Sequence, residues 1–109
     1  MGRVGGNLAA RGFPSESVTA GHELKVLWFV RMPHEGIGLR LAIERLDGPG
    51  TRHVTNLDRA GPSAVPMPAG WERSAAYPSN LTFDGPGCWR IRDIDGSDAD
   101  AVVIQVSSN

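Results

Sequence analysis

The sequence has a single cysteine, Cys88, and no long apolar run among its 109 residues. One cysteine excludes both an internal disulfide framework and a zinc site built from several thiolates. No segment approaches the roughly 20 apolar residues that a membrane-spanning helix needs, so we expect no membrane insertion by this chain. Residues 1–12 also lack the apolar core of a secretion signal and the cysteine of a lipoprotein signal. We therefore expect a cytosolic protein, or an exported one whose targeting segment has been removed.

An excess of basic residues is missing as well. The 11 Lys and Arg residues are balanced by 12 Asp and Glu residues, which gives a net charge of −1. Because this balance provides no attraction for polyanions, we expect neither a nucleic-acid partner nor an anionic-membrane partner. Sustained helical periodicity with caps is absent too, so we expect little helix. The chain is instead rich in Gly (14) and Pro (8), which divide it into short elements and favour β structure.

The clearest pattern in the chain is a β-hairpin between Gly85 and Val106. Apolar and polar residues alternate along both arms, and Asp95-Gly96 supplies turn residues that tolerate a positive φ. On the first arm, we expect Trp89 to anchor the core between two sheets. Everything upstream is predicted to be sheet that packs against this hairpin.

Two upstream segments are strong strand candidates. Residues 24–31 are apolar on both faces, which indicates a central strand covered on both sides, or one face closed by a loop. Residues 39–46 also fit a helical stripe, but flanking glycines and the short length favour a strand with one wet face. We expect further strands at 15–20, 51–57, 71–76 and 81–83, with Tyr77-Pro78-Ser79 separating the last two, and an irregular loop at 60–70.

About seven short strands punctuated by turns predict an all-β fold, an antiparallel sandwich of immunoglobulin-like type. An open barrel is the main alternative. We expect residues 15–109 to form this single domain and residues 1–14 to be a flexible N-terminal arm, or an edge strand at best.

Several short motifs follow one another along the chain. They are Lys25-Val26-Leu27-Trp28, Arg45-Leu46-Asp47-Gly48-Pro49-Gly50, Gly70-Trp71-Glu72-Arg73, Tyr77-Pro78-Ser79, Pro86-Gly87-Cys88-Trp89 and the closing Asp-Gly hairpin into Val-Val-Ile. In this order they resemble a family of small bacterial, largely actinobacterial, proteins that commonly begin with a secretion or lipoprotein signal. The resemblance implies a β-sandwich of the cell envelope, and it brings no catalytic residues.

A copper site is the first metal hypothesis, because copper in a sandwich takes one thiolate, two imidazoles and a weak thioether. The residue types are present, but no histidine follows Cys88 at the usual close spacing, so we expect Cys88 to be a small strand residue. The histidines lie in or beside turns, where exposure to solvent is the ordinary outcome. The side chains concerned are Cys88, His22, His34, His53, Met32 and Met67.

Calcium is the second metal hypothesis, because four carboxylates lie between Asp93 and Asp100 and hard cations prefer clustered oxygen ligands. The spacing does not fit a calcium-binding loop of the EF-hand type. Counted from Asp93, glycine falls at the fourth position instead of the sixth, and Ile104 stands where a glutamate is needed. We therefore expect solvated acids on a hairpin turn, and we assign no cofactor or metal.

Aromatic side chains supply the remaining candidate site. Trp71 follows the Pro-rich loop, so it either plugs the end of the sandwich or shows a face to a partner. We predict a partner-binding surface of Trp71, Arg73 and Tyr77, facing a protein or an envelope glycan. No phosphate-binding loop or Ser-His-Asp order is present. The sequence thus favours a noncatalytic interaction or structural module, and a small ligand-binding or copper- or calcium-binding sandwich is the alternative.

Overall fold

The computed structural model describes residues 3–13, 18–32, 38–47, 52–60 and 68–108, and these form strands and turns without a helix. In chain order the strands are β1 (Arg3–Gly5), β2 (Leu8–Arg11), β3 (Val18–Thr19), β4 (Leu24–Arg31), β5 (Leu39–Arg45), β6 (Arg52–Leu57), β7 (Ser74–Leu81), β8 (Gly87–Asp93) and β9 (Ala101–Ser107). The prediction of an all-β fold is therefore confirmed for this part of the chain.

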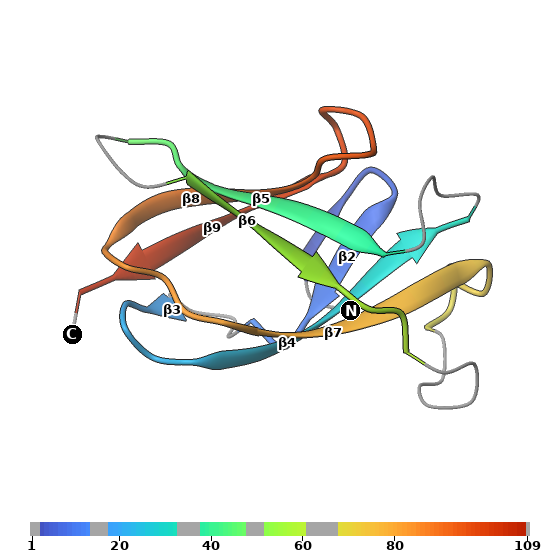
Figure 1. Cartoon of the computed structure of the whole chain (residues 1–109), viewed down its shortest axis with the longest axis horizontal. Coiled ribbons are helices and arrows are strands. Elements are labelled where there is room, and N and C mark those ends of the chain that lie inside the picture. The colour runs from blue at the N-terminus through green and yellow to red at the C-terminus, as the bar shows by residue number, and fades with distance from the viewer. Residues whose placement is uncertain (1–2, 14–17, 33–37, 48–51, 61–67, 109) are drawn as a thin grey trace.

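The strands build two curled sheets. One sheet has four strands in the order β1-β2-β4-β7, and the other has five in the order β3-β9-β8-β5-β6. Neighbouring strands run antiparallel, except that β3 pairs with β9 in parallel. Figure 1 shows β5, β8 and β9 forming one layer and β4 and β7 the other. The predicted hairpin is confirmed as β8 and β9, and β5 is a strand and not a helix.

The main core lies between the two sheets. It takes the alternate apolar residues of the central strands, including Leu39, Leu41 and Ile43 of β5. These side chains are excluded from solvent almost completely, which is the principal source of stability for a domain of this size. The larger members are Trp28, Trp89, Tyr77, Phe83, Leu8, Leu39, Leu41, Ile43, Ile91 and Ile104.

Two tryptophans fix the centre of this core. Trp89 on β8 is 1% exposed, packs edge-on against Phe83, and donates its indole N–H to the Gly85 carbonyl at 2.9 Å. Trp28 on β4 donates to the Ser79 hydroxyl at 3.0 Å. Buried indole N–H groups need such partners, because an unpaired donor in the core destabilises the fold. The prediction that Trp89 anchors the core is confirmed.

A smaller apolar cluster covers the other face of the four-stranded sheet. Ala9, Phe29 and Ala76 come from adjacent strands of this sheet, and Trp71 packs onto them from the loop before β7. Both faces of β4 are therefore buried, as its apolar sequence indicates. The sequence left open whether another layer or a loop covers the second face of this strand, and the structure shows that the loop carrying Trp71 covers it.

The N-terminal residues, which were expected to form a flexible arm or at best an edge strand, lie in two strands. Residues 3–11 form the β1–β2 hairpin, in which β1 is the edge strand of the sheet and β2 pairs with β4. Leu8, Ala9 and Ala10 are fully buried, because one side of β2 faces the main core and the other faces the Trp71 cluster. The turn of this hairpin lies at Gly6, where φ is +57°.

Strand β7 also differs from expectation, because it continues through Tyr77-Pro78-Ser79 without a break. The Ala60 N–H donates to the Ala76 carbonyl at 2.8 Å, so Ala76 directs its backbone groups away from β4. Pro78 is two residues further along and faces the same way. Its missing N–H therefore falls on the free edge of β7, where the ladder with β4 does not need it.

Candidate functional site

Strand β6 is the outermost strand of the five-stranded sheet, and it pairs with β5 alone. The direction of its backbone groups follows from β5. The Arg40 carbonyl accepts a hydrogen bond from the Ile94 N–H at 3.0 Å, so Arg40 directs its backbone toward β8. Because these directions alternate along a strand, Leu39 and Leu41 direct theirs toward β6.

On β6, Leu57 and Thr55 lie opposite these two leucines and complete the ladder. Val54 and Asn56 alternate with them, so their N–H and C=O groups point away from the sheet. Within the described ranges, no backbone hydrogen bond joins these outward groups to another segment. This edge therefore presents two donors and two acceptors to any extended strand that approaches it.

The side chains beside this edge lie on the face of the sheet that points away from the core. Val54 is 45% exposed and lies opposite the fully buried Ala42, whereas Asn56 lies opposite Arg40. Directly opposite residues share a face, so Val54 and Asn56 mark successive positions on one surface. The first position is apolar and the second is polar.

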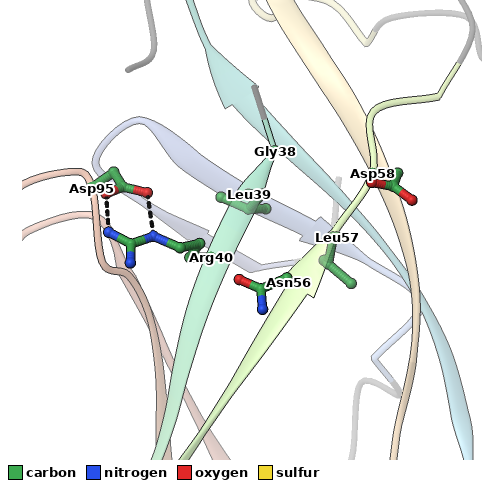
Figure 2. A pocket seen from close by; sticks show the side chains of 7 residues that line it. All are labelled: Gly38, Leu39, Arg40, Asn56, Leu57, Asp58 and Asp95. Atoms are coloured by element: carbon green, nitrogen blue, oxygen red, sulfur yellow. Dashed lines mark hydrogen bonds and ion pairs between the residues drawn. The ribbon is translucent and has the colours of Figure 1, made fainter. Parts of the chain in front are cut away.

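An open pocket of about 430 Å³ adjoins the second position. Figure 2 shows Arg40 and Asp95 on one side of it and Leu57 and Asp58 on the other. It is lined by Gly38, Leu39, Arg40, Asn56, Leu57, Asp58 and Asp95, which come from β5, from the end of β6 and from the β8–β9 loop.

The charge of Arg40 is already matched inside this pocket. Its Nε donates to Asp95 Oδ2 at 3.0 Å and its Nη2 donates to Oδ1, which is the two-pronged geometry of a strong guanidinium–carboxylate pair. These hydrogen bonds and the charge of Asp95 raise the pKa of Arg40 above its ordinary value. The pair forms a polar wall with no net charge.

Asp58 is different, because its carboxylate makes no ion pair with any residue that the structure describes. It is exposed at the point where the chain leaves β6. The neighbouring Arg59 is also exposed, and it is not among the residues that line the pocket. The pocket beside β6 therefore carries an unmatched negative charge.

The structure separates the three residues of the predicted partner-binding surface. Trp71 is 5% exposed in the small cluster, and the Arg31 guanidinium lies 3.8 Å from its ring centroid. Tyr77 is 2% exposed in the main core. Arg73 is exposed and lines a second open depression of about 420 Å³ together with Arg31 and Glu72. Binding through these residues stays a prediction, and what this depression shows to solvent is arginine and glutamate.

Glu72 closes the loop that carries Trp71. Its carboxylate accepts a hydrogen bond from the Gly70 N–H at 3.1 Å. Hydrogen bonds from its own backbone N–H and from that of Gly70 lower the pKa of Glu72. The acid therefore helps to hold this loop in shape.

Two of the acids between β8 and β9 accept hydrogen bonds from backbone N–H groups. Asp100 accepts hydrogen bonds from the Asn7 N–H at 2.7 Å and from the Ser97 N–H at 2.9 Å. Asp93 accepts one from the Asp95 N–H at 3.1 Å. Gly96 does not have the expected positive φ, and it is needed for space, because a Cβ there would meet Asp100 Oδ2 at 2.5 Å.

The residues of the copper hypothesis do not converge either. The Cys88 thiol donates to Gln105 Oε1 at 3.1 Å, and His22 and His53 are exposed on different segments. Within residues 3–13, 18–32, 38–47, 52–60 and 68–108, no group of three or more His, Cys, Asp or Glu side chains could hold a metal ion. His34 and Met67 lie outside these ranges.

Sequence reasoning did not single out Val54, Asn56 or Asp58. The only available signal was the polar character of residues 51–57, which is common for a strand at the edge of a sheet. Edge position itself depends on strand order, and strand order is set by contacts between distant segments.

No family model, curated protein or solved structure matches the chain, so comparison with known proteins assigns no role to this edge. No helix in the described ranges is long and apolar enough to cross a membrane.

Proposed function

We propose that this protein is a noncatalytic interaction module that binds an extended polypeptide by adding it as a strand along β6. The observation that carries the proposal is the outward backbone of Val54 and Asn56, which no described segment pairs. In strand addition, main-chain hydrogen bonds supply affinity and alternate side chains supply specificity. The pocket beside Asn56 lies where an alternate side chain of the added strand would fall.

The other edges are less suited to this role. β7 presents Pro78 on its free edge, and the Ala76 carbonyl is already taken by Ala60. β1 has three residues, with Gly5 against the backbone of Ala101, and β3 has two. Short strands and edge prolines are common protections against unwanted pairing. Strand β6, with six residues, has neither.

Two parts of the proposal rest on the sequence. The cell-envelope setting comes from the family resemblance, which also suggests export. The immunoglobulin-like type is supported by the two sheets that enclose one core and by the alternation of short strands and turns. Neither part is needed for strand addition at β6.

The proposal is tested by selecting short random peptides displayed on phage against the folded protein. Selected peptides are then measured against the variants Val54→Pro and Val54→Thr. Proline removes the outward N–H of residue 54 but no hydrogen bond between β5 and β6, whereas threonine keeps this N–H. We expect Val54→Pro to lower the affinity for the selected peptides about tenfold or more, because a lost hydrogen bond and a steric clash of the proline ring combine. Val54→Thr should change this affinity little.

Amide chemical shifts of labelled protein locate the binding surface. Changes centred on Val54 and Asn56 support the proposal. Peptides that bind the proline variant as tightly as the native protein, or that shift only residues around Arg73, would contradict it. Circular dichroism of both variants checks that the fold is retained.

A further inference from the structure

We infer that the strand recognised by β6 carries an apolar residue and, two positions away on the same face, a lysine or arginine. This inference rests on the proposed function, and it names the chemistry of the partner. It follows from the two side-chain environments that alternate along the outer face of β6.

The apolar position is opposite Val54. A residue of the added strand that exchanges both hydrogen bonds with Val54 points its side chain to the same face of the sheet. There it meets the exposed Val54 side chain, with the buried Ala42 behind it. A β-branched or other apolar side chain covers this surface best, because it removes apolar area from water.

The basic position is opposite Asn56. It is two residues from the first position, because side chains on one face of a strand recur with a period of two. A long side chain at this position reaches the pocket lined by Arg40, Asn56, Asp58 and Asp95. The spacing between the two positions is the same for a parallel and an antiparallel partner.

Charge selects the side chain at this second position. Arg40 and Asp95 cancel one another through their two hydrogen bonds, so the carboxylate of Asp58 sets the sign of the pocket. Arg59, the next residue, does not line the pocket. Opposite charges across an interface favour the matching partner and penalise a like charge. A lysine or arginine is therefore favoured here, and a glutamate is disfavoured.

The probe is a pair of short synthetic peptides with blocked ends. One peptide has the sequence Lys-Thr-Val-Thr-Lys and the other has the sequence Glu-Thr-Val-Thr-Glu. The peptides are designed for antiparallel pairing, in which the valine exchanges both hydrogen bonds with Val54 and the lysine or glutamate lies opposite Asn56. The threonine nitrogens are methylated, so the outer edge cannot pair and the peptides stay soluble, while the valine N–H stays free to meet Val54.

We expect the lysine peptide to bind about tenfold more tightly than the glutamate peptide at low salt, and the difference to shrink as salt rises. Asp58→Asn should reduce the difference to about twofold or less. Asp98→Asn, which removes an exposed acid that does not line the pocket, should leave it unchanged. A lysine peptide methylated on the valine nitrogen should lose binding altogether.

Failure of the inference differs from failure of the proposed function. If both peptides bind equally and shift the amides of β6, strand addition stands and the basic partner is refuted. If neither these peptides nor any selected peptide shifts those amides, strand addition itself is refuted. If sedimentation shows that the free protein is a dimer with protected Val54 and Asn56 amides, the occupant is a second copy and the inference is overturned.

Discussion

Tyr77 is the only tyrosine in the chain, and its ring is buried in the core at 2% exposure. Burial raises the pKa of Tyr77, and the nearby charge of Asp93 adds to the rise, while Arg59 partly opposes it. The folded state thus favours the neutral phenol more than the unfolded state does. Its contribution to stability is complete below pH 10 and is lost as the pH rises through the folded pKa.

The melting temperature of the native protein should therefore fall more steeply above pH 10 than that of Tyr77→Phe, which has no phenol to ionise. Thermal melts across the alkaline range measure this difference. Ultraviolet absorbance of the ionised phenol reports Tyr77 alone, because there is no other tyrosine. Equal alkaline sensitivity of the two proteins, or a phenol that ionises at its ordinary pKa before unfolding, would show that burial does not act on this group.

At the scale of elements, one carboxylate joins two hairpins that are far apart in the sequence. Asp100, at the end of the β8–β9 loop, accepts the Asn7 N–H in the turn between β1 and β2. It is 6% exposed, so the hydrogen bond is sheltered from water. The N-terminal hairpin is thus held at its turn as well as along its ladder with β4.

Asp100→Ala should lower the free energy of unfolding by about 2 kcal/mol, because the Asn7 and Ser97 N–H groups lose their acceptor. Urea unfolding measures the loss, and hydrogen exchange should speed up at residues 8–11. Asp98→Ala is the matched control, because Asp98 is an exposed acid of the same loop. If both variants unfold at the same urea concentration, Asp100 does not hold the hairpin.

The elements that could be predicted from sequence are those whose pattern is local. The bounds of β4 were predicted correctly and those of β5 to within one residue, because the apolar run of β4 and the apolar alternation of β5 are both long. The β1–β2 hairpin was not predicted, because Leu8, Ala9 and Ala10 form an apolar run of three residues, too short to indicate a buried strand. Strand β7 can continue through Pro78 because the proline nitrogen points away from β4. That direction follows from the pairing register with β4, which the sequence of β7 alone does not show.

The candidate site was harder to predict than the fold. Trp71 was expected either to plug the end of the sandwich or to show a face to a partner. It packs on Phe29 on the outer face of β4, and its binding of a partner stays a prediction. The free backbone of Val54 and Asn56 has no signature in residue type. It arises because β5 has β8 on one side and β6 on the other, and nothing described follows beyond β6.

At the scale of the whole molecule, Pro78 protects the free edge of β7. Replacing it by valine restores an outward N–H and raises β propensity on that edge. Pro78→Val should therefore self-associate, with an average mass in sedimentation that rises with concentration above that of the native protein. Pro86→Val, an equally exposed proline in the loop before β8, should behave like the native protein. If Pro78→Val sediments no differently, another feature guards this edge.

The unequal edges also set how many partners the molecule can hold. With β7 blocked by Pro78, and with β1 and β3 very short, β6 is the one long unblocked edge among the described strands. Strand addition there is saturable and ends after a single step, because the complex offers no second long edge of this chain from which to grow. If the protein binds by strand addition, as we propose, its valency is one. It then caps or tethers a single extended segment, and edge pairing alone does not let it nucleate a fibre or cross-link a network.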